Sequence, residues 1–228
     1  MIFSTKPNRN ETLSGGIYLA FMLIFLPLLL RLFNSLTGNT LSAGKLNFLY
    51  YFINFAAILP IFRRFLLQSL KDALKVPFPT IWLALLGYLG NTALSEILTV
   101  LLLVLFPRFA NINDLNIALM LQEDFSLIAF GIVVLVPVVE ETLFRGMIFR
   151  NLYDRSRVGA YLMSMCAFAA IHVVGYVGSV EPVYIVLSFL QYLPAGYCLC
   201  FAYHRSGTII SPILMHMIVN AVAVYSMR

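Results

Sequence analysis

Charged residues are scarce in this chain, and their scarcity excludes an ordinary soluble domain. Only 11% of the 228 residues are Asp, Glu, Lys or Arg, whereas 61% are hydrophobic. An average soluble domain has a charged share of about one quarter. Together with the mean hydropathy of +0.90, this composition indicates an integral membrane protein.

Cysteines and long polar stretches are scarce as well. The three cysteines, Cys166, Cys198 and Cys200, lie in apolar runs, which argues against a disulfide framework or a zinc knuckle. No polar stretch is long enough for a second hydrophobic core, so a single membrane domain over residues 1–228 is expected. The strand alternation of a transmembrane barrel is missing, and several apolar windows reach the ~20 residues that a spanning helix needs. We therefore predict an all-α transmembrane helix bundle.

The apolar runs predict about seven membrane spans. Their approximate bounds are 16–36, 45–62, 80–106, 125–149, 158–174, 183–203 and 208–225. The first three make up an N-terminal part, about 15–106, and the last four a core, about 124–228. The third run is long and carries Asn91 and Glu96 near its middle, so it is tilted, broken or lining the interior. No small-residue cleavage site follows the first run, which predicts an uncleaved span and not a signal peptide.

The basic residues predict that the N-terminus is cytoplasmic. In that orientation ten basic residues fall in inner segments and three in outer ones, as the positive-inside rule requires. This distribution accounts for the net charge of +5 without a nucleic-acid partner. The inner residues are Lys6, Arg9, Arg63, Arg64, Lys71, Lys75, Arg150, Arg155, Arg157 and Arg205, and the outer ones are Lys45, Arg108 and Arg228.

Two adjacent glutamates and an arginine interrupt the run 125–149. Charges inside a bilayer are costly, so Glu140, Glu141 and Arg145 are expected to face a protein interior or a water-filled cavity. Residues four apart share a helix face, so Glu141 can pair with Arg145 while Glu140 lies about 100° away around the axis. One glutamate is then neutralised and the other is free to act as a base. Spacing alone does not decide which of the two is the base.

Two later runs each carry one histidine. A hairpin between the fourth and fifth spans has its midpoint between Glu140 and His172 at Ser156, inside a polar turn, so the two side chains should lie at similar depth. In the last span His216 and Asn220 are four apart and share a face. A single intramembrane histidine is often only structural, but the co-occurrence of these residues favours one shared polar site.

In this order, the patterns Glu140-Glu141-x-x-x-Arg145, Phe168-x-x-x-His172 and His216-x-x-x-Asn220 resemble the three motifs of the CPBP family, also called Abi. This family includes CAAX prenyl endopeptidases of the Ras-converting type and bacteriocin-processing or bacteriocin-immunity membrane proteins. The resemblance covers about residues 124–228, and every motif position is matched.

The resemblance implies an intramembrane endopeptidase that works without a cofactor. Glu140 would activate a water molecule that His172 helps to hold, and His216 and Asn220 would stabilise the oxyanion formed on the scissile carbonyl. The residues implied to orient the site are Glu141, Arg145 and Phe168. No Ser or Cys nucleophile belongs to the motifs, so the reaction should proceed without a covalent intermediate.

The expected substrate is a peptide or a membrane-associated protein, cleaved near the cytoplasmic face of the lipid bilayer. A small chain with short loops fits a bacterial plasma membrane, where a leader peptide or a bacteriocin-related substrate is favoured over a prenylated one. Oligomeric state does not follow from the sequence.

Three alternatives remain beside this interpretation. A metal-dependent protease would bind an ion such as zinc through Glu140, Glu141, His172 and His216, although Arg145 would repel the cation. A membrane immunity or regulatory protein would bind a toxin or a sensor kinase without catalysis. An ion or solute transporter is disfavoured because no inverted repeat is visible.

Overall fold

The computed structural model describes Phe3 and residues 5–228, most of which are helical. The elements of the first half are α1 (Arg9–Ala20), η1 (Phe21–Phe25), α2 (Leu26–Leu36), α3 (Ala43–Ile61), α4 (Arg63–Lys75), α5 (Pro77–Leu105) and α6 (Ile112–Glu123). The elements of the second half are α7 (Phe125–Phe130), η2 (Gly131–Leu135), α8 (Val136–Glu141), η3 (Thr142–Phe149), α9 (Arg150–Tyr153), α10 (Arg157–Ile171), η4 (Val174–Tyr176), α11 (Pro182–Ser206) and α12 (Ile210–Ser226). The prediction of an all-α membrane bundle is confirmed.

Short polar side chains fix where many of these helices begin. Each accepts a hydrogen bond from a backbone N–H of the first turn, which would otherwise have no acceptor in the helix. The capping residues of this kind are Asn8, Ser42, Asn111, Asp124 and Ser156. At the other end of α11, Gly207 adopts a left-handed φ of 73° and lets the chain turn directly into α12.

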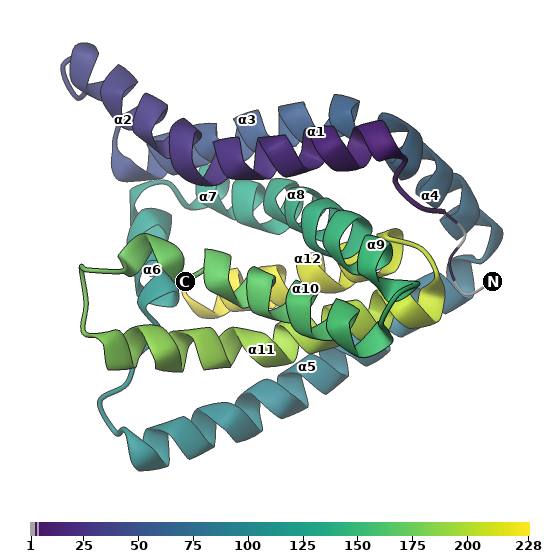
Figure 1. The fold of residues 1–228 in the computed structure, drawn as a ribbon. Coiled ribbons are helices and arrows are strands. Elements are labelled where there is room, and N and C mark those ends of the chain that lie inside the picture. Colours follow the sequence, from purple (N-terminus) through teal and green to yellow (C-terminus); the bar gives the residue numbers. More distant parts are fainter. Residues whose placement is uncertain (1–2, 4) are drawn as a thin grey trace.

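The helices pack in three layers (Figure 1). The long helix α1–η1–α2 lies beside α3 at one edge, and α5 lies beside α11 at the other. Between them run α7–α9, α10 and α12, with α12 packed against both α5 and α8. The middle layer carries most of the polar side chains of the predicted site.

The expected number of spans is only partly supported. Four continuous helices are long and apolar enough to cross a membrane, namely Arg9–Leu36, Pro77–Leu105, Phe125–Tyr153 and Pro182–Ser206. The third predicted span is therefore one unbroken helix. The second ends in an 84° bend between α3 and α4, and counting this pair as one span gives up to five. The helices α10 and α12 are apolar but shorter than a full span. The orientation of the N-terminus stays a prediction.

Two segments that the sequence assigned to connections are helical. The basic residues 63–75 form α4, which buries Phe65, Ser69 and Ala73 and exposes its cations. The polar segment after α5 contains α6, whose charged and amide side chains mask its helical pattern. Neither segment is apolar enough to be recognised as a span, and both form helices because they pack against the bundle.

Candidate active site

A cavity of about 580 Å³ lies between the layers and contains the four predicted catalytic residues. Glu140, His172, His216 and Asn220 all line it, whereas Glu141 does not. Glu96, which the sequence left without a partner, lines it too. Many of the remaining lining side chains carry amides or hydroxyls, namely Asn47, Asn54, Asn91, Ser95, Thr99, Asn111, Asn113 and Gln191. The cavity lining thus combines polar groups with apolar side chains such as Met22, Ile132 and Val136.

Glu141 is held by two partners behind the cavity wall. Its Oε1 atom accepts a hydrogen bond of 3.0 Å from Nη1 of Arg145, which confirms the predicted pair. The same oxygen lies 2.8 Å from Nδ1 of His216. Because the carboxylate pairs with Arg145 and acts as an acceptor, Nδ1 of His216 is the donor. Glu141 and Arg145 are fully buried, so this glutamate is already neutralised.

Phe168 stands at the centre of the polar residues and fixes their spacing. The guanidinium of Arg145 lies over its ring at 4.3 Å from the centroid. The rings of His172 and His216 pack against the same phenyl ring, at centroid distances of 4.7 and 5.7 Å. Phe168 therefore touches both histidines and the arginine, and its role in orienting the site stays a prediction.

The position of the Arg145 guanidinium also depends on the close approach of α10 and α11. Its Nη2 atom donates to the carbonyl of Gly196 at 3.2 Å. A Cβ atom built on Gly196 would lie 2.9 Å from Cγ and 3.1 Å from Cα of Met165, so glycine is the residue that fits here.

Gly196→Ala is therefore expected to destabilise the protein by about 1–3 kcal/mol, because the added methyl group forces α10 and α11 apart. Thermal unfolding in one detergent, compared with wild type, measures the effect. The matched control is Gly90→Ala on α5, where the new Cβ would meet Sγ of Cys198 at an ordinary 3.6 Å. An unfolding temperature of Gly196→Ala equal to that of Gly90→Ala would contradict the packing argument.

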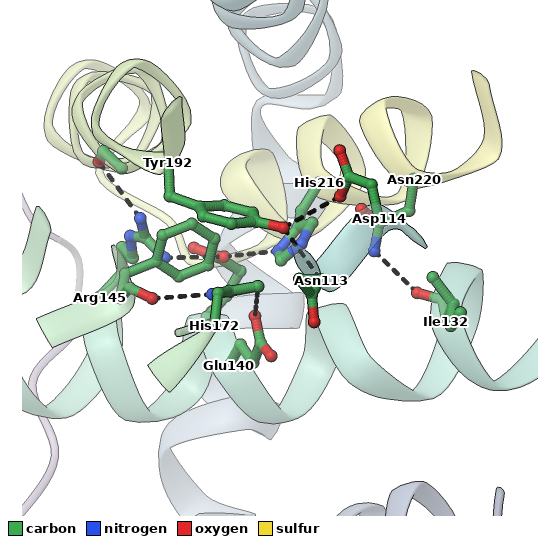
Figure 2. Close-up of polar contacts among 12 residues, drawn as sticks. Asn113, Asp114, Ile132, Glu140, Arg145, His172, Tyr192, His216 and Asn220 are labelled. Carbon is green, nitrogen blue, oxygen red and sulfur yellow. Dashed lines mark hydrogen bonds and ion pairs between the residues drawn. The ribbon is translucent and has the colours of Figure 1, made fainter. Parts of the chain in front are cut away.

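Glu140 and His172 face each other across a short gap. Nε2 of His172 lies 3.9 Å from Oε2 of Glu140, so the predicted match in depth is confirmed (Figure 2). Nδ1 of His172 is 2.8 Å from the carbonyl of Phe168 and donates to it, which leaves Nε2 as an acceptor. Oε2 of Glu140 is buried and has no hydrogen-bond partner among the described residues. Oε2 of Glu140 and Nε2 of His172 are therefore two proton acceptors that face the same gap.

Asn220 is held by an irregularity in the helix that carries the glutamates. In the π-helical η2, the N–H of Val136 bonds to the carbonyl of Gly131, five residues back. The next residue, Pro137, has no N–H, so the carbonyl of Ile132 lacks the donor that would continue this pattern. Nδ2 of Asn220 donates to that carbonyl at 2.8 Å (Figure 2). The amide is thereby fixed at the edge of the cavity.

Tyr192, Asn113 and Asp114 also line this cavity, although no sequence pattern marks them. The ring of Tyr192 is stacked on that of His172 with centroids 4.1 Å apart. Its hydroxyl donates to Oδ1 of Asp114 at 3.1 Å and accepts from Nδ2 of Asn113 at 2.9 Å. Burial raises the pKa of Asp114, while the hydrogen bond from Tyr192 lowers it. The partners are 78 and 79 residues apart, so no local spacing could reveal them.

The predicted residues are not arranged as a metal site. Within the described part of the chain, no three or more His, Cys, Asp or Glu side chains are placed to hold a metal ion. His216 and Glu141 are close, but Arg145 shares the same carboxylate oxygen. A cation at this position would meet the positive guanidinium, so the donor set does not fit one.

Residues 122–222 match the family model described as type II CAAX prenyl endopeptidase Rce1-like. This part of the chain, somewhat less than half of it, is similar to that family. The matched residues include all seven motif residues, the elements from α7 to α11 and most of α12. Most of α6, with Asn113 and Asp114, precedes them. Neither a curated protein nor a solved structure matches the chain. This similarity agrees with the resemblance seen in the motifs and supports a CAAX-protease-like peptidase in the membrane.

Proposed function

We propose that the protein is an intramembrane endopeptidase in which Glu140 activates a water molecule. The observation that carries this proposal is the gap of 3.9 Å between Glu140 and His172 in a cavity that His216 and Asn220 also line. A polar contact of this length suits a bridging water. Such a water would donate one hydrogen to Oε2 of Glu140 and the other to Nε2 of His172, leaving an oxygen lone pair for the scissile carbonyl.

Glu140 is the better candidate for the base because Glu141 is already engaged. Glu141 is bound to Arg145 and His216 behind the cavity wall, whereas Oε2 of Glu140 has no partner among the described residues. In the reaction Glu140 would take a proton from water as the oxygen attacks the carbonyl carbon. The same proton would pass to the leaving amine when the C–N bond breaks.

His216 and Asn220 supply the donors for the oxyanion. Nδ1 of His216 is used by Glu141, so Nε2 is the nitrogen left for a substrate. Nε2 would donate to the oxyanion when both ring nitrogens carry a hydrogen. The amide of Asn220 has a second N–H beside the one bound to Ile132. Fixed donors of this kind stabilise a developing oxyanion without having to reorient.

The amides and hydroxyls among the lining side chains suit a peptide backbone. Amides and hydroxyls can bond the backbone of an extended peptide, whereas a prenyl chain would leave them without partners. We therefore place a leader peptide or a bacteriocin-related peptide, cleaved near the cytoplasmic face of a bacterial plasma membrane, ahead of a farnesylated CAAX sequence.

The test is cleavage of a mixed peptide library, including farnesylated CAAX peptides, by pure protein in detergent. Wild type, Glu140→Ala and His216→Ala are compared by mass spectrometry, each with EDTA or with added zinc. Cleavage of unmodified peptides by wild type only, unaffected by EDTA, is the expected result.

Three results would overturn parts of the proposal. Loss of cleavage in EDTA would favour the metal-dependent protease. Cleavage confined to farnesylated peptides would overturn the substrate class. No cleavage by folded wild type under any condition would favour an immunity or regulatory protein that binds a toxin or a sensor kinase.

A further inference from the structure

The helix α6 is anchored at both of its ends beside the cavity. At its N-terminal end Nδ2 of Asn111 donates to Oε1 of Gln191 on α11 at 2.9 Å. At its C-terminal end Oε2 of Glu123 accepts from the backbone N–H of Gly44 on α3 at 2.8 Å. A hydrogen bond with the side chain of Ser42, together with the one from Gly44, lowers the pKa of Glu123. Bonds to two different layers hold α6 in a fixed place, and side chains on α6 can therefore position others.

The hydroxyl of Tyr192 is fixed by two side chains of α6. It donates to Asp114 and accepts from Asn113, so its single donor and one of its acceptor sites are used (Figure 2). The amide of Asn113 is itself oriented, because its Oδ1 atom accepts from the hydroxyl of Tyr176 at 3.4 Å. These bonds leave the phenol ring little freedom to swing.

The ring of Tyr192 in turn limits the position of His172. The two rings are nearly parallel, at an angle of 25°. Phe168 contacts the imidazole as well, and the Phe168 carbonyl accepts from its Nδ1 atom. His172 immediately follows the last residue of α10, so its backbone is not continued by a further helical turn. Without the Tyr192 ring, the imidazole could rotate away from Glu140.

We propose that Asn113, Asp114 and Tyr192 form a clamp that positions His172 against Glu140. The helix α6 then belongs to the active site although it lies mostly outside the matched residues 122–222. Tyr192 is a positioning residue, since it acts on the reaction through His172. This inference rests on the proposed function, in which His172 and Glu140 share the attacking water.

Kinetics of four variants test the clamp. Tyr192→Phe keeps the ring and removes the hydroxyl, and kcat should fall about tenfold with little change in KM, because a less fixed His172 holds the attacking water less well. Asp114→Ala should have a similar effect. The double variant should be no slower than the slower single variant, because both changes remove the same bond. Tyr161→Phe is the matched control, since it removes a hydroxyl from α10 that bonds His204 instead, and it should keep the wild-type kcat.

A second measurement does not depend on catalysis. The chain has three histidines, so a protein purified without a histidine tag gives few imidazole signals in an NMR spectrum. His172→Gln identifies the signal of His172. Stacking on Tyr192 shields this ring, so Tyr192→Leu should move its signal downfield while Tyr161→Phe leaves it in place.

The outcomes separate the clamp from the proposed function. An increase in KM at unchanged kcat would make Tyr192 a substrate-binding residue and overturn the clamp. Additive losses in the double variant, or a His172 signal that ignores Tyr192→Leu, would overturn it as well. Glu140→Gln that cleaves as fast as wild type would instead refute the proposed function, and the NMR result would still decide whether Tyr192 positions His172.

Discussion

Glu140→Gln is expected to lower kcat by about 10²–10⁴-fold, the usual contribution of a general base, while KM and thermal stability stay close to wild type. The amide has the shape of the carboxylate but cannot take a proton. Stability should be kept because Oε2 of Glu140 forms no hydrogen bond with the described residues, so its replacement breaks none. Steady-state kinetics and thermal unfolding on the same preparation measure both quantities.

For the neighbouring Glu141 we expect a different effect on stability. Glu141→Gln removes the charge that binds Arg145 and His216, so we expect a loss of stability together with the loss of activity. Glu181→Gln is the control for the chemical change itself, because Glu181 is exposed at the start of α11 and outside the cavity. If Glu140→Gln kept more than about a tenth of the wild-type kcat, Glu140 could not be the base.

Arg145→Met is expected to destabilise the protein by about 3–5 kcal/mol, because it leaves the carboxylate of Glu141 buried without its cation. Arg145 is fully buried and bonds both Glu141 and the carbonyl of Gly196. Unfolding by denaturant in mixed micelles, or the amount of folded protein recovered from membranes, measures the loss.

Two further variants test whether burial is the cause. Glu141→Gln combined with Arg145→Met removes both charges and should recover part of the stability lost in Arg145→Met alone. Lys75→Met breaks an exposed ion pair with Asp72, in which 70% of the lysine side chain is accessible, so its cost should stay below about 1 kcal/mol. Equal costs for Lys75→Met and Arg145→Met would show that burial does not set the energy of the pair.

Local spacing predicted the parts of the site that lie on one helix or one hairpin. The pairing of Glu141 with Arg145 follows from four residues of separation, and the depth match of Glu140 and His172 follows from the hairpin. Apolar length likewise predicted the four long spanning helices. These features depend on residues close in sequence, where helical geometry leaves few possibilities.

Contacts between distant helices could not be predicted in the same way. His216 and Asn220 share a face as expected, but nothing in their spacing shows that one binds Glu141 and the other the carbonyl of Ile132. The stacking of Tyr192 on His172 depends on how α10 and α11 cross, and the role of α6 depends on a helix too polar to be noticed. These contacts are determined by how helices that are distant in sequence pack against one another.

Because Pro137 has no backbone N–H, a side chain of α12 can bond a carbonyl of η2. An alanine there would offer an N–H that could compete with Asn220 for the carbonyl of Ile132. The proline leaves this carbonyl to the side chain, and the amide is anchored across 88 residues of sequence as soon as α12 packs. A residue without a polar side chain thereby determines where the amide of Asn220 stands, and the packing of α12 in the folded domain places the donor that we propose for the oxyanion.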